Sequence, residues 1–122
     1  MKILITGVAG FIGFSIANKL IQNRKNLVYG IDNFDNYYSI KYKKHRIDQI
    51  KNKKNFFFKN LDIRNKKKLQ KVFKNNYFDA VLHFAAQAGV RYSLINPKKY
   101  LDVNKKGFEN LLNSLKKSPP KK

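Results

Sequence analysis

The chain has 122 residues, of which 43% are hydrophobic, so it is long enough for one domain with a buried core and too hydrophobic for a disordered protein. It has no cysteine and only two histidines, which excludes disulfides and a cysteine nucleophile and argues against a metal site. The net charge of +20 could attract nucleic acid, but 23 of the 27 basic residues are lysines scattered over every segment, whereas base and phosphate recognition favours arginine, so we expect no nucleic-acid partner.

The distribution of apolar residues predicts four strands that alternate with four helices. The strands are short apolar runs at residues 2–6, 27–31, 56–58 and 78–85, and the helices, where apolar residues recur at helical spacing, cover 11–23, 40–51, 66–76 and 98–116. After a loop at 86–97, the last helix is expected to turn inward Leu101, Phe108, Leu111, Leu112 and Leu115. Buried strands that alternate with helices form a parallel sheet covered on both faces, so the sequence predicts a doubly wound α/β fold.

The first apolar run is too short for a secretion signal, because Thr6 and Gly7 interrupt it. No other stretch approaches the length of a transmembrane helix. We therefore expect a cytoplasmic protein with no membrane partner.

Three glycines occupy the turn between the first strand and the first helix, in the stretch TGVAGFIG. In such a turn Gly7 permits a tight bend, Gly10 lets the backbone approach a pyrophosphate, and Gly13 lets the helix pack close to the sheet. The pyrophosphate would lie at the helix N-terminus, where free N–H groups and the helix dipole favour an anion. An ordinary glycine-rich turn is the alternative, but the position between a strand and a helix favours dinucleotide binding.

Asp32 follows the second strand, 19 residues after Gly13. A carboxylate at this place accepts hydrogen bonds from the adenosine ribose and repels a 2′-phosphate, and no Arg or Lys follows it before Lys41. Both observations favour NAD over NADP. The alternative is that Asp32 merely forms a turn with Asn33.

Four stretches together resemble the extended short-chain dehydrogenase/reductase superfamily: TGVAGFIG, GIDNFDNYY, HFAAQAGVRYS and DVNKKGFENLL. Within it they are most similar to NAD-dependent epimerases of nucleotide sugars, above all UDP-glucuronate 4-epimerases and related capsule-sugar epimerases. The resemblance implies a Rossmann-type doubly wound parallel sheet that is incomplete here, with four β-α units. It also implies NAD as cofactor and a UDP-sugar as substrate.

The resemblance assigns the cofactor to residues that follow each of the four strands. They are Gly7, Gly10, Phe11, Ile12, Gly13, Asp32, Asn33, Asp62, Ile63, Ala85, Ala86, Gln87 and Asn104. Asp62 and Ile63 would lie beside the adenine, with a helix cap and a core contact as their alternatives. Asn104 would lie near the cofactor from the last helix, unless it is simply an exposed helical residue.

On the substrate side, the resemblance points to Arg91 and Ser93 in the stretch GVRYS. The Arg91 guanidinium could bind a phosphate or a sugar carboxylate, and a surface position is the alternative for both residues. His83 lies within an apolar strand, so we expect a packed residue rather than an acid–base catalyst. The resemblance also implies a homodimer formed through the last helix.

Epimerases of this kind use a catalytic Tyr followed four residues later by a Lys, on a helix after the fifth strand. The only such spacing here is Tyr37–Lys41, which directly follows the second strand, so we assign no catalytic residue in this chain. We expect residues 1–117 to form part of an NAD-binding domain and 118–122 a Pro/Lys tail, and the chain alone to be inactive. A fragment of a nucleotide-sugar 4,6-dehydratase or reductase, or a non-catalytic NAD-binding module, are the alternatives.

Overall fold

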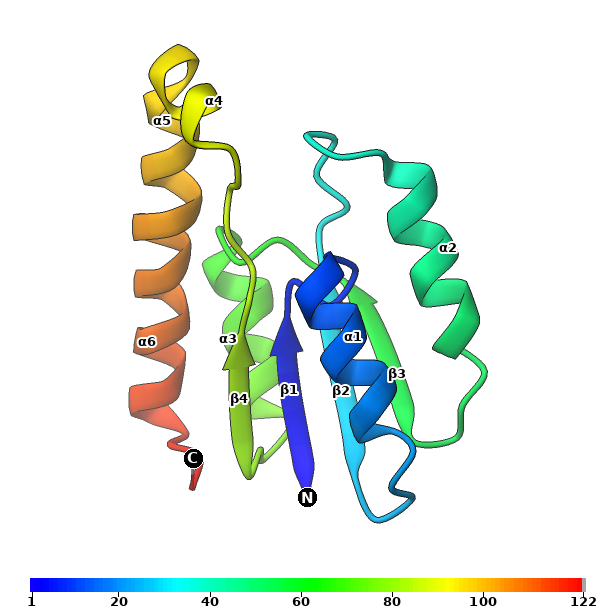
Figure 1. Ribbon diagram of the computed structural model, residues 1–122. Coiled ribbons are helices and arrows are strands. Elements are labelled where there is room, and N and C mark those ends of the chain that lie inside the picture. The colour runs from blue at the N-terminus through cyan, green and yellow to red at the C-terminus, as the bar shows by residue number, and fades with distance from the viewer. Residues whose placement is uncertain (122) are drawn as a thin grey trace.

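A computed structural model describes residues 1–121 and shows an alternating α/β fold (Figure 1). Its strands are β1 (Lys2–Thr6), β2 (Leu27–Asp32), β3 (Phe56–Asn60) and β4 (Ala80–His83). Its helices are α1 (Phe11–Leu20), α2 (Ile40–Ile50), α3 (Lys66–Lys74), α4 (Val90–Ile95), α5 (Pro97–Tyr100), a π-helical segment η1 (Leu101–Gly107) and α6 (Phe108–Lys117).

The strands form one parallel sheet in the order β3-β2-β1-β4. In the register of this sheet, Ile5 of β1 pairs with Gly30 on one side and with Leu82 on the other. Because all four strands are parallel, their carboxyl ends meet at one edge, where the loops that follow them come together (Figure 1). The predicted fold class is confirmed.

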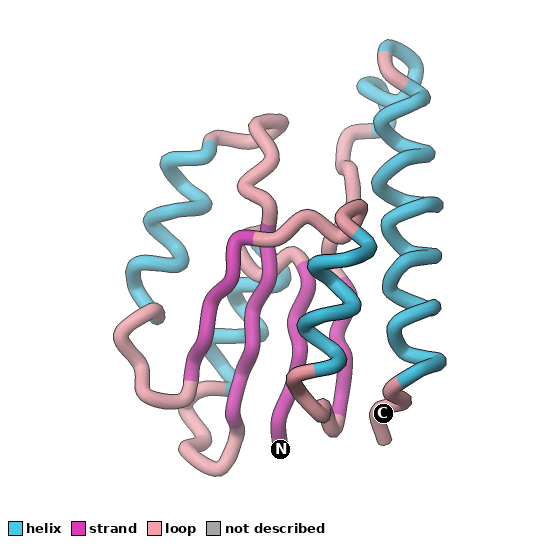
Figure 2. The backbone as a smooth tube through the Cα atoms, turned by 180° about the vertical axis from the view of Figure 1, so that it is seen from behind, coloured by secondary structure: helices cyan, strands magenta, loops and turns pink. Residues whose placement is uncertain are grey.

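Helices cover both faces of the sheet, as Figure 2 shows from behind. On one face α1 and α2 pack over Ile3 and Ile5, and on the other α3 and α6 pack over Leu4. This division follows from the alternation of side chains along a strand. Each layer contains a continuous apolar cluster, so the sheet is buried between two cores.

Helix α3 illustrates how the sequence specifies an element. The Asn65 side chain caps its N-terminus by accepting a hydrogen bond from the N–H of Lys68 at 3.0 Å. Leu69, Val72 and Phe73 are buried on one stripe of the helix, and the lysines of the helix face solvent.

The segment between β4 and α6 differs from the prediction. Residues 86–97 were expected to be a loop, but they contain α4, and Asn96 then caps α5 by accepting from the N–H of Lys99 at 3.1 Å. Pro97 at the first position of α5 has no N–H to satisfy, so it starts this helix. The single predicted helix 98–116 is therefore a composite of α5, η1 and α6.

The prediction of which residues of that composite helix face the core is mostly wrong. Leu111 is buried and Leu115 is half-buried, but Leu101, Phe108 and Leu112 are exposed. Hydrophobic periodicity finds an apolar stripe without identifying its partner. Smaller differences concern boundaries: α1 ends at Leu20 rather than at residue 23, and β4 covers only the middle of the predicted run 78–85.

Within residues 1–121, no helix combines the length and the apolar character that crossing a membrane requires. The same part of the chain has no group of three or more acidic, histidine or cysteine side chains placed to bind a metal ion. Helix α6 ends at Lys117, and Lys122, the last residue of the predicted tail, lies outside the described residues.

Candidate functional site

A cleft of about 640 Å³ opens at the carboxyl edge of the sheet, between the loops that follow the four strands. The predicted cofactor residues that line it are Gly7, Gly10, Phe11, Ile12, Gly13, Asp32, Asn33, Asp62, Ile63, Ala85, Ala86 and Gln87. Asn104 does not line the cleft, and neither do Arg91 and Ser93. The fold thus brings together residues that follow each of the four strands and lie far apart in the sequence.

The glycine turn is built so closely that side chains cannot fit at two of its positions. Gly7 has a φ of +72°, and a Cβ there would lie 2.6 Å from the backbone N of Ala85. A Cβ on Gly13 would overlap the carbonyl oxygen of Gly7. These contacts draw β1, α1 and the end of β4 together at the floor of the cleft.

Gly10 has a different role at the start of α1. It is the N-cap residue with extended backbone angles, and a Cβ there would approach only the Gly7 carbonyl oxygen, at 3.1 Å. The first N–H groups of a helix have no partner within the helix, so those of residues 11–13 remain available to a ligand. A glycine N-cap leaves the space before them open, which is the arrangement that binds phosphate.

Asp32 is 7% exposed and holds the glycine turn against the end of β2. Its Oδ2 accepts a hydrogen bond from the N–H of Ala9 at 3.0 Å, and its Oδ1 accepts from the N–H of Phe34 at 2.8 Å. Each carboxylate oxygen retains a lone pair after this single bond. Asp32 therefore has a structural role that the sequence did not predict, and it keeps the capacity to accept from a ribose hydroxyl.

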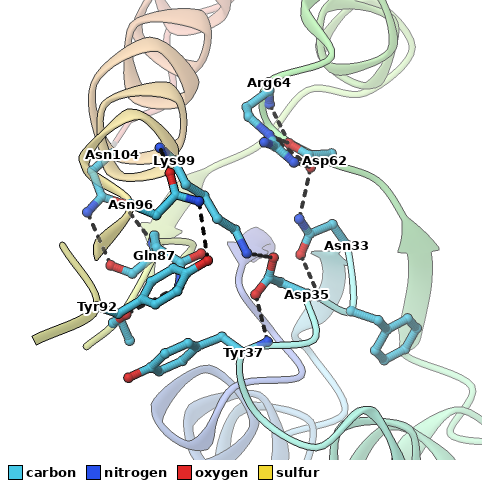
Figure 3. Close-up of polar contacts among 12 residues, drawn as sticks. Asn33, Asp35, Tyr37, Asp62, Arg64, Gln87, Tyr92, Asn96, Lys99 and Asn104 are labelled. Atoms are coloured by element: carbon cyan, nitrogen blue, oxygen red, sulfur yellow. Dashed lines mark hydrogen bonds and ion pairs between the residues drawn. The ribbon is translucent and has the colours of Figure 1, made fainter. Parts of the chain in front are cut away.

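Asp62 forms a polar cluster with Asn33 and Arg64 (Figure 3). Arg64 donates to both carboxylate oxygens, with its shortest bond at 2.7 Å, and the Asn33 amide donates to Oδ2 at 2.9 Å. Burial by itself would raise the pKa of Asp62, but the hydrogen bonds from Arg64 and Asn33 lower it to about 2. The carboxylate stays ionised and fixes Asn33 at the end of β2.

Asn104 holds the backbone of Gln87 on the other side of the cleft. Its Oδ1 accepts from the Gln87 N–H at 2.7 Å and its Nδ2 donates to the Gln87 carbonyl at 3.2 Å (Figure 3). This residue lies in the π-helical segment, a kind of distortion that often occurs at functional sites. Asn104 thus reaches the cleft through Gln87 instead of lining it.

A model of the family described as GDP-mannose 4,6 dehydratase matches residues 4–122. The chain belongs to this NAD-dependent epimerase/dehydratase family. It is 47% identical over 112 residues to Protein CapI of Staphylococcus aureus, covering 92% of this chain and 33% of that protein. It is 42% identical over 113 residues to UDP-glucuronate 4-epimerase of Thermodesulfobacterium geofontis, covering 93% of this chain and 35% of that protein.

Among solved structures, the chain is similar to UDP-glucuronic acid 4-epimerase from Bacillus cereus in complex with UDP-glucuronic acid and NAD. The TM-score is 0.87 at 35% sequence identity, and the match covers 95% of this chain and 36% of that chain. The chain therefore spans about a third of the length of the relatives it matches.

The two residues predicted to face the substrate of an epimerase or dehydratase both lie on α4. Arg91 is exposed, and the Ser93 hydroxyl donates to the Val90 carbonyl. Neither lines the cleft, so their assignment to substrate stays a prediction. Tyr37 lines the cleft from the β2 side, and Lys41 is exposed on α2, away from the end of β4.

The sequence did not predict that α2 contributes to the cleft of this family member. Lys43 and Arg46 both line it, and the Arg46 guanidinium donates to the Ala9 carbonyl at 3.1 Å. Their spacing of three on a helix with Ile47 and Ile50 buried was the available signal. Although no Lys or Arg follows Asp32 in the sequence before Lys41, the fold thus places two cations of α2 in the cleft that Asp32 also lines.

A polar cluster joins β1 to β4 beneath the cleft. The buried Thr6 hydroxyl oxygen accepts from the N–H groups of Phe84 and Ala85, both at 3.2 Å, and lies 2.6 Å from Nδ1 of His83. With its oxygen accepting twice, the hydroxyl donates to Nδ1, so neutral His83 has its proton on Nε2. The His83 ring stacks on Phe108 at 5.3 Å, and burial lowers its pKa. His83 is thus a half-buried packing residue.

Proposed function

We propose that this chain is the NAD-binding part of a nucleotide-sugar 4-epimerase that acts on UDP-glucuronate or a similar UDP-sugar. The observation that supports this most is the glycine turn. Side chains cannot fit at Gly7 and Gly13, and Gly10 leaves the start of α1 open. The cleft beside it suits an extended dinucleotide, because its volume of about 640 Å³ lies within the range of cofactor sites. The Bacillus cereus structure, solved with NAD and UDP-glucuronic acid, supports the same assignment.

In this proposal each loop binds one part of NAD. The N–H groups of residues 11–13 bind the pyrophosphate. Asp32 and Asn33 accept hydrogen bonds from the adenosine ribose hydroxyls. Asp62 and Ile63 lie beside the adenine. The small residues Ala85 and Ala86, with Gln87 held by Asn104, let the backbone approach the rest of the cofactor.

NAD, when bound, would supply the reversible hydride transfer at C4 of the sugar by which that carbon is inverted. The chain's own residues bind and orient the cofactor for this reaction, and none of them is assigned as the acid–base catalyst. We propose that Arg91 and Ser93 face the UDP-sugar. We expect residues 1–122 on their own to bind NAD without catalysing epimerisation.

The test is calorimetric titration of the purified chain with NAD and, separately, with NADP. We expect NAD to bind and NADP to bind at least about tenfold more weakly, since Asp32 repels a 2′-phosphate. Asp32→Ala should abolish NAD binding, whereas Asp48→Ala, an exposed carboxylate on α2, should not change it. Because Asp32 also holds the glycine turn, circular dichroism must show that the variant is folded. A folded wild-type chain that does not bind NAD contradicts the proposal.

The family model bears the description of a 4,6-dehydratase, so a dehydratase is the second candidate. Both reactions begin by oxidation at C4, and NAD binding alone does not separate them. The protein that contains the family's catalytic Tyr and Lys, incubated with UDP-glucuronate, should yield the C4 epimer without loss of water. A 4-keto-6-deoxy product from a nucleotide hexose would favour the dehydratase.

We also propose that the last helix contributes to a homodimer. Leu101, Phe108 and Leu112 are exposed along η1 and α6, and apolar side chains grouped on one helix are typical of interfaces. Sedimentation should show a dimer that Leu112→Lys dissociates, and a monomeric wild-type chain at high concentration would contradict this proposal.

Three further expectations stay predictions. They are a role in capsule polysaccharide synthesis, a cytoplasmic location, and the division of the chain into a domain of residues 1–117 and a tail of residues 118–122.

A further inference from the structure

An ion pair joins two segments on opposite sides of the cleft. Asp35 lies in the loop between β2 and α2, and Lys99 lies on α5, beyond β4. The Lys99 ammonium is 2.8 Å from Oδ2 of Asp35, and the two side chains are only 20% and 23% exposed (Figure 3). Such partial burial reduces screening by solvent, so this contact is stronger than an ordinary surface pair.

Further contacts hold both partners in place. The N–H of Tyr37 donates to Oδ1 of Asp35 at 2.9 Å, and the ammonium of Lys43 donates to the Asp35 carbonyl at 2.8 Å. On the other side, the Lys99 ammonium lies 5.6 Å from the ring centre of Tyr92. Asp35 is therefore oriented by its own loop and by α2, and Lys99 by α4.

Aromatic side chains extend the contact. The rings of Tyr37 and Tyr92 lie 5.2 Å apart, and a Cβ on Gly89 would overlap the Tyr37 hydroxyl. Gly89 has a φ of +93°, so the backbone before α4 takes a conformation that glycine favours and that leaves room for the Tyr37 ring. The two loops thus touch through a charged pair and an aromatic pair.

The sheet order shows what lies between these loops. β1 separates β2 from β4, and the glycine turn follows β1. A contact from the loop after β2 to the helices after β4 must therefore cross above the glycine turn. Asp35 and Tyr37 also line the cleft, so the contact stands at its wall.

We propose that Asp35 and Lys99, together with Tyr37 and Tyr92, form a clasp that closes over a bound dinucleotide and slows its release. This inference rests on the proposed NAD-binding function. Asp35 and Lys99 act here as positioning residues, because they hold the loop over the cofactor through each other. A partly exposed ion pair contributes enough to change the release rate about three- to tenfold.

The test measures the release of NADH, followed by its fluorescence, when the loaded chain is mixed with excess NAD in a stopped-flow instrument. Asp35→Asn and Lys99→Met should each accelerate release about three- to tenfold, and the double variant should be no faster than the faster single one, because either change breaks the same pair. Asp48→Asn is the matched control, since it breaks the exposed pair with Lys51 and should leave the rate unchanged.

A second readout uses the ligand-free chain. Hydrogen exchange of the amides of residues 35–38 should be faster in Asp35→Asn and Lys99→Met than in the wild type. Equal NADH release rates in wild type and both single variants would overturn the clasp while leaving NAD binding intact. A wild-type chain that does not bind NADH would contradict the proposed function and therefore also the clasp, which rests on it. Additive effects in the double variant would show that Asp35 and Lys99 act separately, which would also contradict the clasp.

Discussion

The two sides of the cleft are organised differently. On the side of β1, β2 and β3, carboxylates hold the loops that follow β1 and β2: Asp32 holds the glycine turn, and Asp62 holds Asn33. On the side of β4, the helices α4, η1 and α6 expose apolar residues such as Leu94, which is 83% exposed, and Phe108. The first side thus has loops held by contacts within the chain, whereas the second combines a few polar anchors, such as Asn104, with an apolar surface suited to a partner.

Substitution of a glycine on each side tests this difference most strongly. Gly13→Ala places a methyl group on the Gly7 carbonyl oxygen, which belongs to a backbone that cannot move, so we expect a loss of at least about 3 kcal/mol in the free energy of unfolding. Gly107→Ala meets the Cδ1 and Cγ1 atoms of the Ile63 side chain rather than backbone, and we expect a loss of only about 1 kcal/mol, because that side chain can adjust and helix propensity offsets part of the contact. Urea unfolding measures both, and equal losses would contradict the comparison.

The two faces of α6 provide the second test. Leu111 is 1% exposed against the core, whereas Leu112 is 41% exposed. Leu111→Ala should lower the free energy of unfolding by about 2 to 3 kcal/mol, and Leu112→Ala by less than about 1 kcal/mol, as measured at a chain concentration where sedimentation shows monomer. A large effect of Leu112→Ala in the monomer would show that both faces are packed within the chain.

The third test measures how the free energy of unfolding depends on acid pH through Asp62, on the β3 side of the cleft. Its pKa is about 2 in the folded chain and 3.8 as a free group, so its contribution is present above pH 4 and is lost as the pH falls towards 2. Because the carboxylate is partly exposed, we expect this loss to be about 1 kcal/mol. Asp62→Asn should therefore be less stable than the wild type at pH 5 and about equally stable at pH 2. A constant difference between these pH values would contradict this account.

The smallest effect is expected at His83, on the β4 side. Burial lowers the pKa of this imidazole below 6.5, so the unfolded chain takes up the proton first and stability falls as the pH drops below about 6.5. His83→Gln should weaken this dependence between pH 7 and 5, by less than the effect of Asp62→Asn. His45→Gln, at the exposed histidine of α2, is the matched control for the change of residue type.

The sequence predicted the elements and topology well where local signals and burial agree. The continuous apolar run of Ile3, Leu4 and Ile5 indicated a buried strand, and the two cores confirm it. The three glycines indicated a turn where side chains cannot fit, and the contacts of Gly7 and Gly13 agree with that expectation. Periodicity and glycine chemistry are local properties, so one sequence suffices to read them.

The partners of these elements were decided by the tertiary structure. The sequence could not show that Asp32 binds the N–H of Ala9, that α2 brings Lys43 and Arg46 to the cleft, or that Asp35 meets Lys99 across it. It also gave the last helix an inward face that Leu101, Phe108 and Leu112 do not have. The chain's own pattern thus determined which residues form strands, helices and the glycine turn. Which of them meet around the cleft depended on contacts between residues far apart in sequence, which form only when the sheet assembles.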